Sequence, residues 1–214
     1  MTIQHEHRPT RAEQRQAKAD AAHGEAERTR RRRRTVMIAW IIGAGIVAAL
    51  IAAALVTSRP QQSGIATPAA PFTMTNTDGQ QVSLADYAGK KNVLLYFSEG
   101  AGCQACLAQM GAIEKKQAAF DKLDTVVLPV VMNTKEQIMH DMTVNGVKTP
   151  FLLDDGRLST AYGTIGKGMH GGLPGHSFVL IDKTGTQRWY GEYPSMWLAP
   201  DQLATEVSNH LPSS

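Results

Sequence analysis

The sequence predicts an α/β domain with a mixed central sheet and helices on both of its faces, preceded by a single transmembrane helix. Three observations support this prediction. Strand-like and helix-like segments alternate in the second half of the chain and end in a hairpin and a last helix, an order typical of a mixed sheet. A Cys-x-x-Cys pair, Cys103 and Cys106, follows a strand pattern and opens a helical one. Residues 36–56 form an uncharged apolar run.

The N-terminal part is expected to anchor the chain in a membrane. The 21 residues of the apolar run reach about 31 Å as a helix, which spans a bilayer core and exceeds the apolar region of a cleaved secretory signal. Residues 1–34 hold ten Lys or Arg and five Asp or Glu, and they lack the apolar residues that a core needs. Since positive charge stays on the cytoplasmic side, the N-terminus is expected inside the cell and the C-terminal domain outside.

Composition therefore divides the chain into four regions. We expect a cytoplasmic basic polar head over 1–34, a transmembrane anchor over 35–57, a linker over 58–71 and a globular domain over 72–211. The linker is assigned because Ser, Pro, Gln, Ala and Gly dominate that stretch. The membrane topology also explains the arginine run at residues 30–34, so no nucleic-acid partner is expected.

The globular domain begins with extended segments. Residues 72–87 hold two short extended pieces around the turn Thr77-Asp78-Gly79. Residues 93–97 are continuously apolar, as in a strand buried on both faces. From Cys103 onward, apolar residues recur at helical spacing.

The remaining segments complete the alternation. Residues 125–132 are rich in β-branched side chains and predict a strand. The patterns that follow predict, in chain order, a helix over 135–144, a short helix over 157–162, a hairpin with strands at 177–181 and 188–190, and a last helix from Pro200 to about His210.

This element order, with Cys-x-x-Cys after the first central strand, resembles the thioredoxin fold. Residues 72–211 resemble more closely its redoxin branch, the peroxiredoxin-like and membrane-tethered thioredoxin-like proteins of the bacterial envelope. The resemblance rests on four stretches: residues 72–79, residues 95–97 with the cysteines, residues 150–162, and residues 178–185. The branch contains both thiol peroxidases and disulfide reductases.

The two activities can be weighed at the cysteines. Peroxidases of this branch carry Pro-x-x-x-Thr-x-x-Cys and a distant Arg, which stabilise the oxygen–oxygen transition state. Here Cys106 matches the peroxidatic cysteine, but Cys103 stands in place of the Thr, Glu99 in place of the Pro, and His176 in place of the Arg. A Cys in place of the Thr creates a dithiol pair. The resemblance therefore favours disulfide exchange, with peroxide reduction as the alternative.

The expected reaction is thiol–disulfide exchange with protein substrates. Cys103, at the first helical turn, would attack a substrate disulfide, and Cys106 would resolve the mixed disulfide. His176 is a candidate stabiliser of the thiolate when protonated, and Glu99 is a candidate proton acceptor. Family members place a cis-proline opposite the dithiol to bind the substrate backbone. Pro174, with Gly175, is the nearest candidate for that site, unless His176 fills the position.

No cofactor is expected. Because the chain has no third cysteine, a separate and membrane-associated electron donor is expected to restore the site. A second alternative is a copper-binding envelope module without turnover, since thiolate, thioether and imidazole suit Cu(I). Its candidate ligands include Met139, His140, Met142, Met169, His170 and His176. A purely structural disulfide would close too small a loop to stabilise much.

Overall fold

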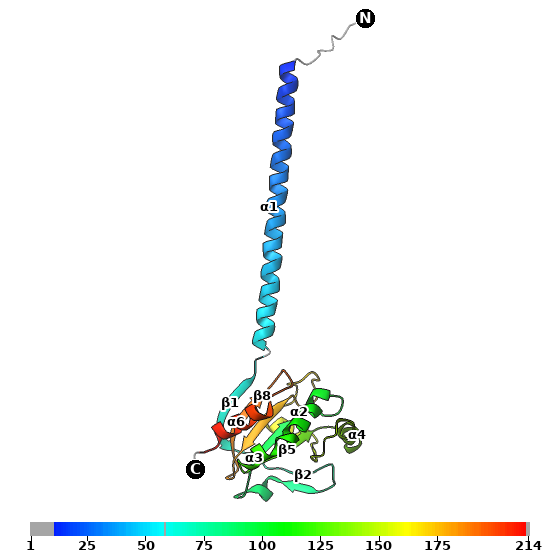
Figure 1. Ribbon diagram of the computed structural model, residues 1–214, viewed down its shortest axis with the longest axis vertical. Helices are drawn as coiled ribbons and strands as arrows, with labels where there is room; N and C mark the ends of the chain where they lie inside the picture. Colours follow the sequence, from blue (N-terminus) through cyan, green and yellow to red (C-terminus); the bar gives the residue numbers. More distant parts are fainter. Residues whose placement is uncertain (1–10, 58, 213–214) are drawn as a thin grey trace. The chain divides into compact units, whose positions relative to one another are not determined.

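A computed structural model describes residues 11–57 and 59–212. The chain divides into two compact units, Met1–Thr57 and Ser58–Ser214, and each is described by itself. Figure 1 shows the helical first unit and the α/β second unit. The first ten residues of the predicted polar head lie outside the described residues.

The first unit is one continuous helix, α1 (Arg11–Thr57). Its segment Arg30–Thr57 is long and apolar enough to cross a membrane, and none of it is buried within the protein. By length and composition this segment fits either a membrane span or a signal sequence near the N-terminus. The predicted head is helical from Arg11 onward.

The second unit is built on a six-stranded mixed sheet with the order β1-β8-β7-β4-β5-β6. The central strand β4 pairs in parallel with β5 and antiparallel with β7, which confirms the predicted mixed sheet. The strands are β1 (Gln61–Pro68), β4 (Asn92–Phe97), β5 (Thr125–Val131), β6 (Leu152–Leu153), β7 (Ser177–Ile181) and β8 (Thr186–Glu192). A separate hairpin, β2 (Thr73–Thr75) with β3 (Gln81–Ser83), encloses the predicted Thr-Asp-Gly turn.

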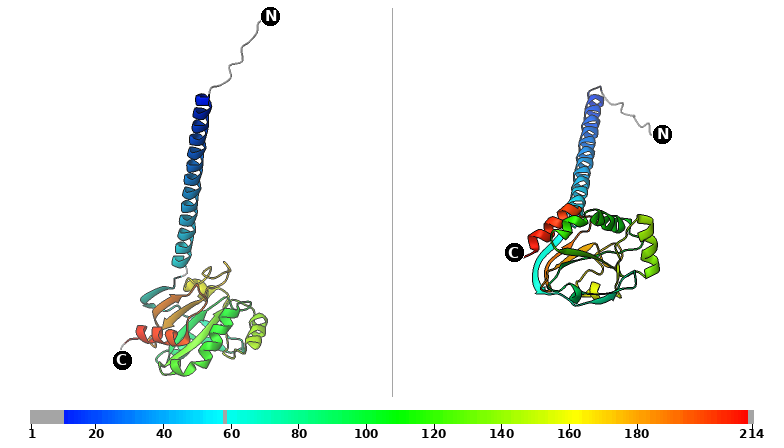
Figure 2. Two further views of the ribbon diagram at one scale, coloured as in Figure 1. Left: turned by 45° about the horizontal axis from the view of Figure 1, so that its top comes forward. Right: turned by 60° about the horizontal axis from the view of Figure 1, so that its bottom comes forward.

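Helices cover both faces of this sheet, as predicted. One face packs against α2 (Gln104–Lys115), α3 (Gln117–Asp121), α4 (Lys135–Asn145) and α6 (Pro200–His210). The other face packs against the short helix η1 (Leu84–Tyr87) and α5 (Arg157–Ala161). Figure 2 shows these layers from two further sides. All six residues of β4 are buried because both of its faces are covered.

Strand β1 occupies most of the stretch for which the sequence predicted a linker, so that prediction is wrong for residues 61–68. β1 lies antiparallel to β8, with Gln62 opposite Gly191, and the Gln62 amide donates a hydrogen bond of 2.8 Å to the Tyr193 hydroxyl. Its described side chains are exposed, because β1 forms an edge of the sheet. A solvated edge strand shows no apolar alternation, so its composition resembles that of a flexible connection.

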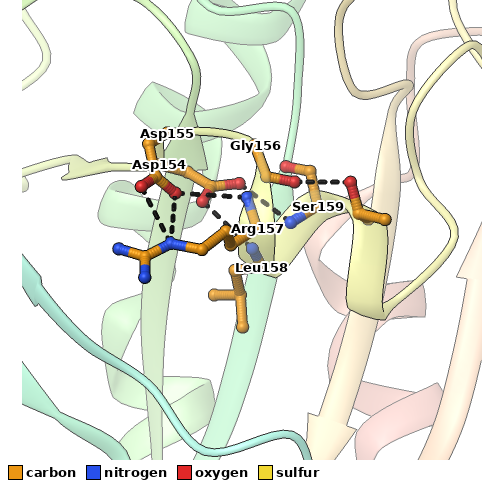
Figure 3. Close-up of polar contacts among 7 residues, drawn as sticks. Asp154, Asp155, Gly156, Arg157, Leu158 and Ser159 are labelled. Atoms are coloured by element: carbon orange, nitrogen blue, oxygen red, sulfur yellow. Dashed lines mark hydrogen bonds and ion pairs between the residues drawn. The ribbon is translucent and has the colours of Figure 1, made fainter.

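Helix α5 follows the turn Asp154-Asp155-Gly156, and Asp154 holds that turn in place. The buried Asp154 carboxylate accepts hydrogen bonds from the backbone N–H groups of Leu158 at 3.1 Å and Ser159 at 2.8 Å (Figure 3). The adjacent Asp155 is exposed and pairs with the side chain of Arg157 at 2.8 Å. Asp155 also accepts a hydrogen bond of 3.2 Å from the Arg157 N–H, so the two carboxylates together satisfy the backbone donors at the start of α5.

Candidate functional site

The two cysteines form a disulfide at the N-terminal end of α2, with Cα atoms 5.3 Å apart. Cys103 is the N-cap residue of α2, and its Sγ accepts a hydrogen bond of 3.3 Å from the Cys106 N–H. After reduction, a thiolate at this position would keep that donor and would face the positive end of the helix dipole. The Cys-x-x-Cys spacing thus places both sulfurs on one helical turn.

The two sulfurs differ in accessibility. Cys103 is 7% exposed and Cys106 is 1% exposed, so Cys103 is the side chain that an approaching molecule reaches first. This order matches the predicted order of attack. Cys103 is nevertheless largely covered, because this residue packs into the main apolar core beneath α2.

The loop before Cys103 is fixed by residues from two other elements. Ala101 N–H donates to Asn133 Oδ1 at 2.9 Å, and Gly102 N–H donates to Asp141 Oδ2 at 2.7 Å. Gly100 has a φ of +72°, and a Cβ there would clash with Asn133. Sequence reasoning missed Asn133 and Asp141, because they follow β5 and lie within α4, more than 30 residues from the loop.

The hydroxyl of Tyr96 connects the cysteine turn to His176. Tyr96 Oη lies 3.2 Å from the carbonyl oxygen of Cys106 and 3.2 Å from His176 Nδ1. His176 is 1% exposed, and its Nε2 has no hydrogen-bond partner among the residues that the structure describes. Sequence reasoning treated Tyr96 as one member of an apolar strand and gave it no role at the site.

Burial changes the chemistry that the sequence proposed for His176. Removal from water lowers the pKa of the His176 imidazole to about 4, because burial disfavours the charged ring. The ring is therefore neutral at pH 7. The predicted stabilisation of a thiolate by protonated His176 does not operate in this arrangement, and any role of this residue must be one for a neutral imidazole.

Glu99 is also buried, at 2% exposure, and its carboxylate is occupied by His170. Glu99 Oε2 lies 2.8 Å from His170 Nδ1, and Oε1 accepts a hydrogen bond of 3.0 Å from the His170 N–H. Burial acts to raise the pKa of Glu99, but the hydrogen bonds from His170 and the Met169 backbone outweigh it and hold this pKa below its ordinary value. Such a carboxylate is a weak proton acceptor, which argues against the predicted role. In this structure Glu99 anchors the glycine-rich loop of residues 166–175, which carries His170.

Pro174 and Gly175 lead into β7 and are buried. The peptide bond before Pro174 is trans, and no cis bond occurs elsewhere in the described ranges, so the cis-proline of the family pattern is missing here. Gly175 N–H donates to the Thr164 carbonyl at 2.8 Å, and a Cβ at this glycine would clash with the Lys167 backbone. These backbone groups thus pair with a loop of the same domain, which replaces the substrate contact expected from the sequence.

The predicted copper ligands lie on separate elements. Met139 and His140 are exposed on α4, Met142 is buried in the core, and Met169 and His170 belong to the glycine-rich loop. His170 contacts Glu99, and His176 contacts Tyr96. Within residues 11–57 and 59–212, no group of three or more His, Cys, Asp or Glu side chains is placed to hold a metal ion.

Comparisons with known proteins place the fold and the cysteines in context. Residues 65–189 match the sequence model of the family described as AhpC/TSA. Peroxiredoxin Q, chloroplastic, from Sedum lineare is 28% identical over 117 residues, which cover 54% of this chain and 61% of that protein. Alkyl hydroperoxide reductase E from Mycobacterium bovis is 27% identical over 141 residues, 62% of this chain and 91% of that protein.

The structural comparison agrees with these sequence matches at the level of the fold. The crystal structure of reduced 2-Cys peroxiredoxin from Plasmodium vivax superposes with a TM-score of 0.61 at 21% identity, covering 69% of this chain and 96% of that one. At this identity the likeness concerns the fold alone. The match to the Sedum lineare protein spans less than two thirds of that protein's length.

Proposed function

From the premise that this chain belongs to the AhpC/TSA family, and is thus a redoxin-type thiol oxidoreductase, we propose that it exchanges disulfides with protein substrates through Cys103 and Cys106. One observation carries the proposal: the two cysteines close a disulfide on the first turn of α2. Cys103 is the more accessible sulfur and receives an N–H donor at the helix N-terminus. Both features favour it as the attacking thiolate.

The proposed reaction consists of two displacements. The Cys103 thiolate attacks one sulfur of the substrate disulfide, which forms a mixed disulfide and releases one substrate thiolate. The Cys106 thiolate then attacks Cys103 Sγ, which closes the Cys103–Cys106 disulfide and releases the second substrate thiolate. The substrate gains two electrons and the protein loses two. A separate donor returns them, because the chain holds no other cysteine.

The rigid loop before Cys103 supports this chemistry. Asn133 and Asp141 hold the backbone of Ala101 and Gly102, so the position of the attacking sulfur is fixed before a substrate arrives. A sulfur that is already in place loses little conformational freedom in the transition state. We propose Cys103 as the nucleophile and Cys106 as the resolving cysteine. Glu99 contributes to this site by its hydrogen bonds to His170, which fix the loop that carries His170.

The first prediction tests the assigned roles of the two cysteines. The full chain in detergent, supplied with dithiothreitol, should reduce insulin disulfides, and Cys103→Ser should fall to the rate of dithiothreitol alone because the attacking sulfur is gone. Cys106→Ser is the matched control. It keeps the nucleophile, so after reduction and removal of dithiothreitol it should form a mixed disulfide with insulin that is visible on a non-reducing gel. Full activity in Cys103→Ser would refute the assignment.

Peroxide reduction is the second candidate, favoured by the peroxiredoxin and alkyl hydroperoxide reductase names of the relatives. In that reaction the Cys106 thiolate attacks a peroxide oxygen, and the resulting sulfenic acid condenses with the Cys103 thiol to release water. Cys106 is 1% exposed, and Cys103 and His176 stand where the peroxidase pattern has its Thr and its Arg. We therefore expect slow hydrogen peroxide consumption. Fast consumption by Cys103→Ser would favour the peroxidase instead.

We also propose that α1 anchors the protein in the cell membrane, with its N-terminus in the cytoplasm and the redoxin domain outside. The apolar length of residues 36–56 and the arginines at residues 30–34 support this topology. A domain held at the membrane is best supplied with electrons by another membrane protein, so we place the donor there.

A further inference from the structure

A run of arginines meets the apolar segment of α1 without a break in the helix. Residues 30–34 are all arginine and all exposed, and the uncharged residues 36–56 follow almost directly. At the boundary, the hydroxyl of Thr35 shares its hydrogen between the carbonyl oxygens of Arg31 at 2.8 Å and Arg32 at 3.0 Å. Because the helix is continuous, the distance along its axis from each arginine to the apolar run is fixed.

The arginines nearest the boundary have no carboxylate among their neighbours on the helix. Side chains three and four residues apart are neighbours on a helical surface. For Arg32, Arg33 and Arg34, these neighbours are arginine, threonine, valine, methionine or isoleucine, and residues 28–57 contain no Asp or Glu. Like charges one turn apart repel each other, so an anion from outside the helix would stabilise this part of α1.

The position of the arginines along the helix matches the headgroup layer of a bilayer. If residues 36–56 fill the hydrocarbon core, a rise of about 1.5 Å per residue puts Arg34 about 3 Å and Arg30 about 9 Å outside it. The headgroup layer is about 5–8 Å thick on each side of the core. Successive residues turn by about 100°, so five of them cover the whole circumference of the helix. Their guanidinium groups therefore reach lipid phosphates on every side.

One face of α1 combines this charge with an aromatic ring. Arg32, Arg33, Val36, Met37 and Trp40 line a shared hollow on the surface of the helix. Within it, Trp40 is 76% exposed and Met37 is 57% exposed, so their apolar surface is open to a ligand. Two guanidinium groups at one end and apolar surface at the other match a lipid with an anionic headgroup and an acyl chain.

We propose that Arg32, Arg33 and Trp40 form a binding site for an anionic phospholipid of the cytoplasmic leaflet. The inference rests on the proposed membrane anchor. Each planar guanidinium donates paired hydrogen bonds to the phosphate oxygens, and Trp40 packs against the upper part of the acyl chain. The other arginines of the run raise the local concentration of anionic lipid around the helix. The arginine run thus has a ligand as well as a part in membrane orientation.

Competition between two lipids tests the site. The full chain in a neutral detergent is mixed with equal amounts of phosphatidylglycerol and phosphatidylcholine and is captured on an affinity resin. The lipids that remain bound after washing are quantified by mass spectrometry. We expect about tenfold enrichment of phosphatidylglycerol at about 0.1 M salt. The enrichment should largely disappear at about 1 M salt, where the Debye length falls to about 3 Å.

The decisive variant is Arg32→Gln combined with Arg33→Gln, which should lose most of the enrichment. Arg32→Lys combined with Arg33→Lys should keep part of it, because an ammonium group keeps the charge without the paired hydrogen bonds. The matched control, Arg11→Gln with Lys18→Gln, changes the net charge equally at exposed positions about 27 Å or more from residue 36. It should keep the full enrichment. An equal loss in the control would refute a site at Arg32 and Arg33.

The outcomes distinguish the lipid site from the anchor. Release of the full chain from phosphatidylcholine vesicles by alkaline carbonate would overturn the anchor. A chain that stays in these vesicles, but retains the two lipids equally in the competition, would overturn only the lipid site. RNA added at the same phosphate concentration should not displace the phosphatidylglycerol. Displacement by RNA would identify the arginines as a nucleic-acid site and would refute the lipid proposal.

Discussion

His176 illustrates how burial decides the chemistry of a single residue. On the surface, an imidazole beside a cysteine pair would be partly protonated and would stabilise a thiolate by its charge. Here the ring is enclosed between Tyr96 and Phe178, and within residues 11–57 and 59–212 only its Nδ1 finds a hydrogen-bond partner. Burial thereby converts the side chain from a partly charged group into a ring that is neutral at pH 7.

The buried imidazole should also make the folded domain sensitive to acid. The folded pKa of about 4 lies below the ordinary value of 6.5, so the unfolded chain binds the proton first as the pH falls. The contribution of the neutral His176 ring to the free energy of unfolding is fully present above pH 6.5. It is lost as the pH falls toward 4, which lowers the free energy of unfolding by about 3 kcal/mol. Urea unfolding of the wild type and His176→Asn at several pH values should give a shallower acid loss in the variant. Parallel curves would contradict this expectation.

The residues of the site differ in how far the sequence could reveal them. Cys103 and Cys106 are three positions apart, so the geometry of one helical turn was enough to pair them. Tyr96 and His176 are 80 positions apart, and Glu99 and His170 are 71 apart. These contacts depend on how β4, β7 and the glycine-rich loop meet in space. No local pattern encodes them, and the wrong roles assigned to His176 and Glu99 follow from that.

Among the elements, those with strong local signals were predicted well. α6 begins at Pro200 and ends at His210, as its Pro signal and periodicity indicated. β4 was recognised because both of its faces are apolar. β1 was not, because an edge strand is defined by its hydrogen bonds to a neighbour rather than by apolar side chains. Apolar patterns in a sequence reveal which side chains are buried. The described side chains of β1 are exposed, so this strand leaves no such pattern.

The edge strand gives a prediction about where the domain starts. A chain that begins at Phe72, the boundary suggested by the sequence, would lack β1 and its six residue pairs with β8. It should be less stable to urea, by on the order of 3 kcal/mol, than a chain that begins at Ser58, and it should aggregate more readily because β8 becomes an open edge. Equal stability of the two chains would show that β1 contributes little.

At the scale of the whole molecule, the apolar helix and the cysteine pair belong to different units of the chain. The apolar segment Arg30–Thr57 fits a membrane span or a signal sequence by length and composition. The cysteines, Tyr96 and His176 all belong to the second unit. The redox chemistry is therefore encoded separately from the segment that we propose as the anchor.

The proposed anchor predicts how the intact protein fractionates. In cells, the full chain should stay in the membrane pellet after alkaline carbonate extraction, because residues 36–56 remain in the bilayer. Protease added to intact spheroplasts should digest the redoxin domain, since this domain faces outward. A soluble product that has lost its N-terminal segment would identify a cleaved signal sequence and contradict the anchor.

The short distance between the two cysteines affects how well the thiols resist irreversible oxidation. Oxidants damage a thiol irreversibly when a sulfenic acid persists long enough to meet a second oxidant and become a sulfinic acid. In this protein each sulfur has its partner on the same helical turn, and the closed pair is nearly shielded from solvent. Any sulfenic acid formed there is captured by its neighbour and returns to a reducible state. We expect this chain to resist hyperoxidation under conditions that inactivate thiol enzymes whose two cysteines lie far apart.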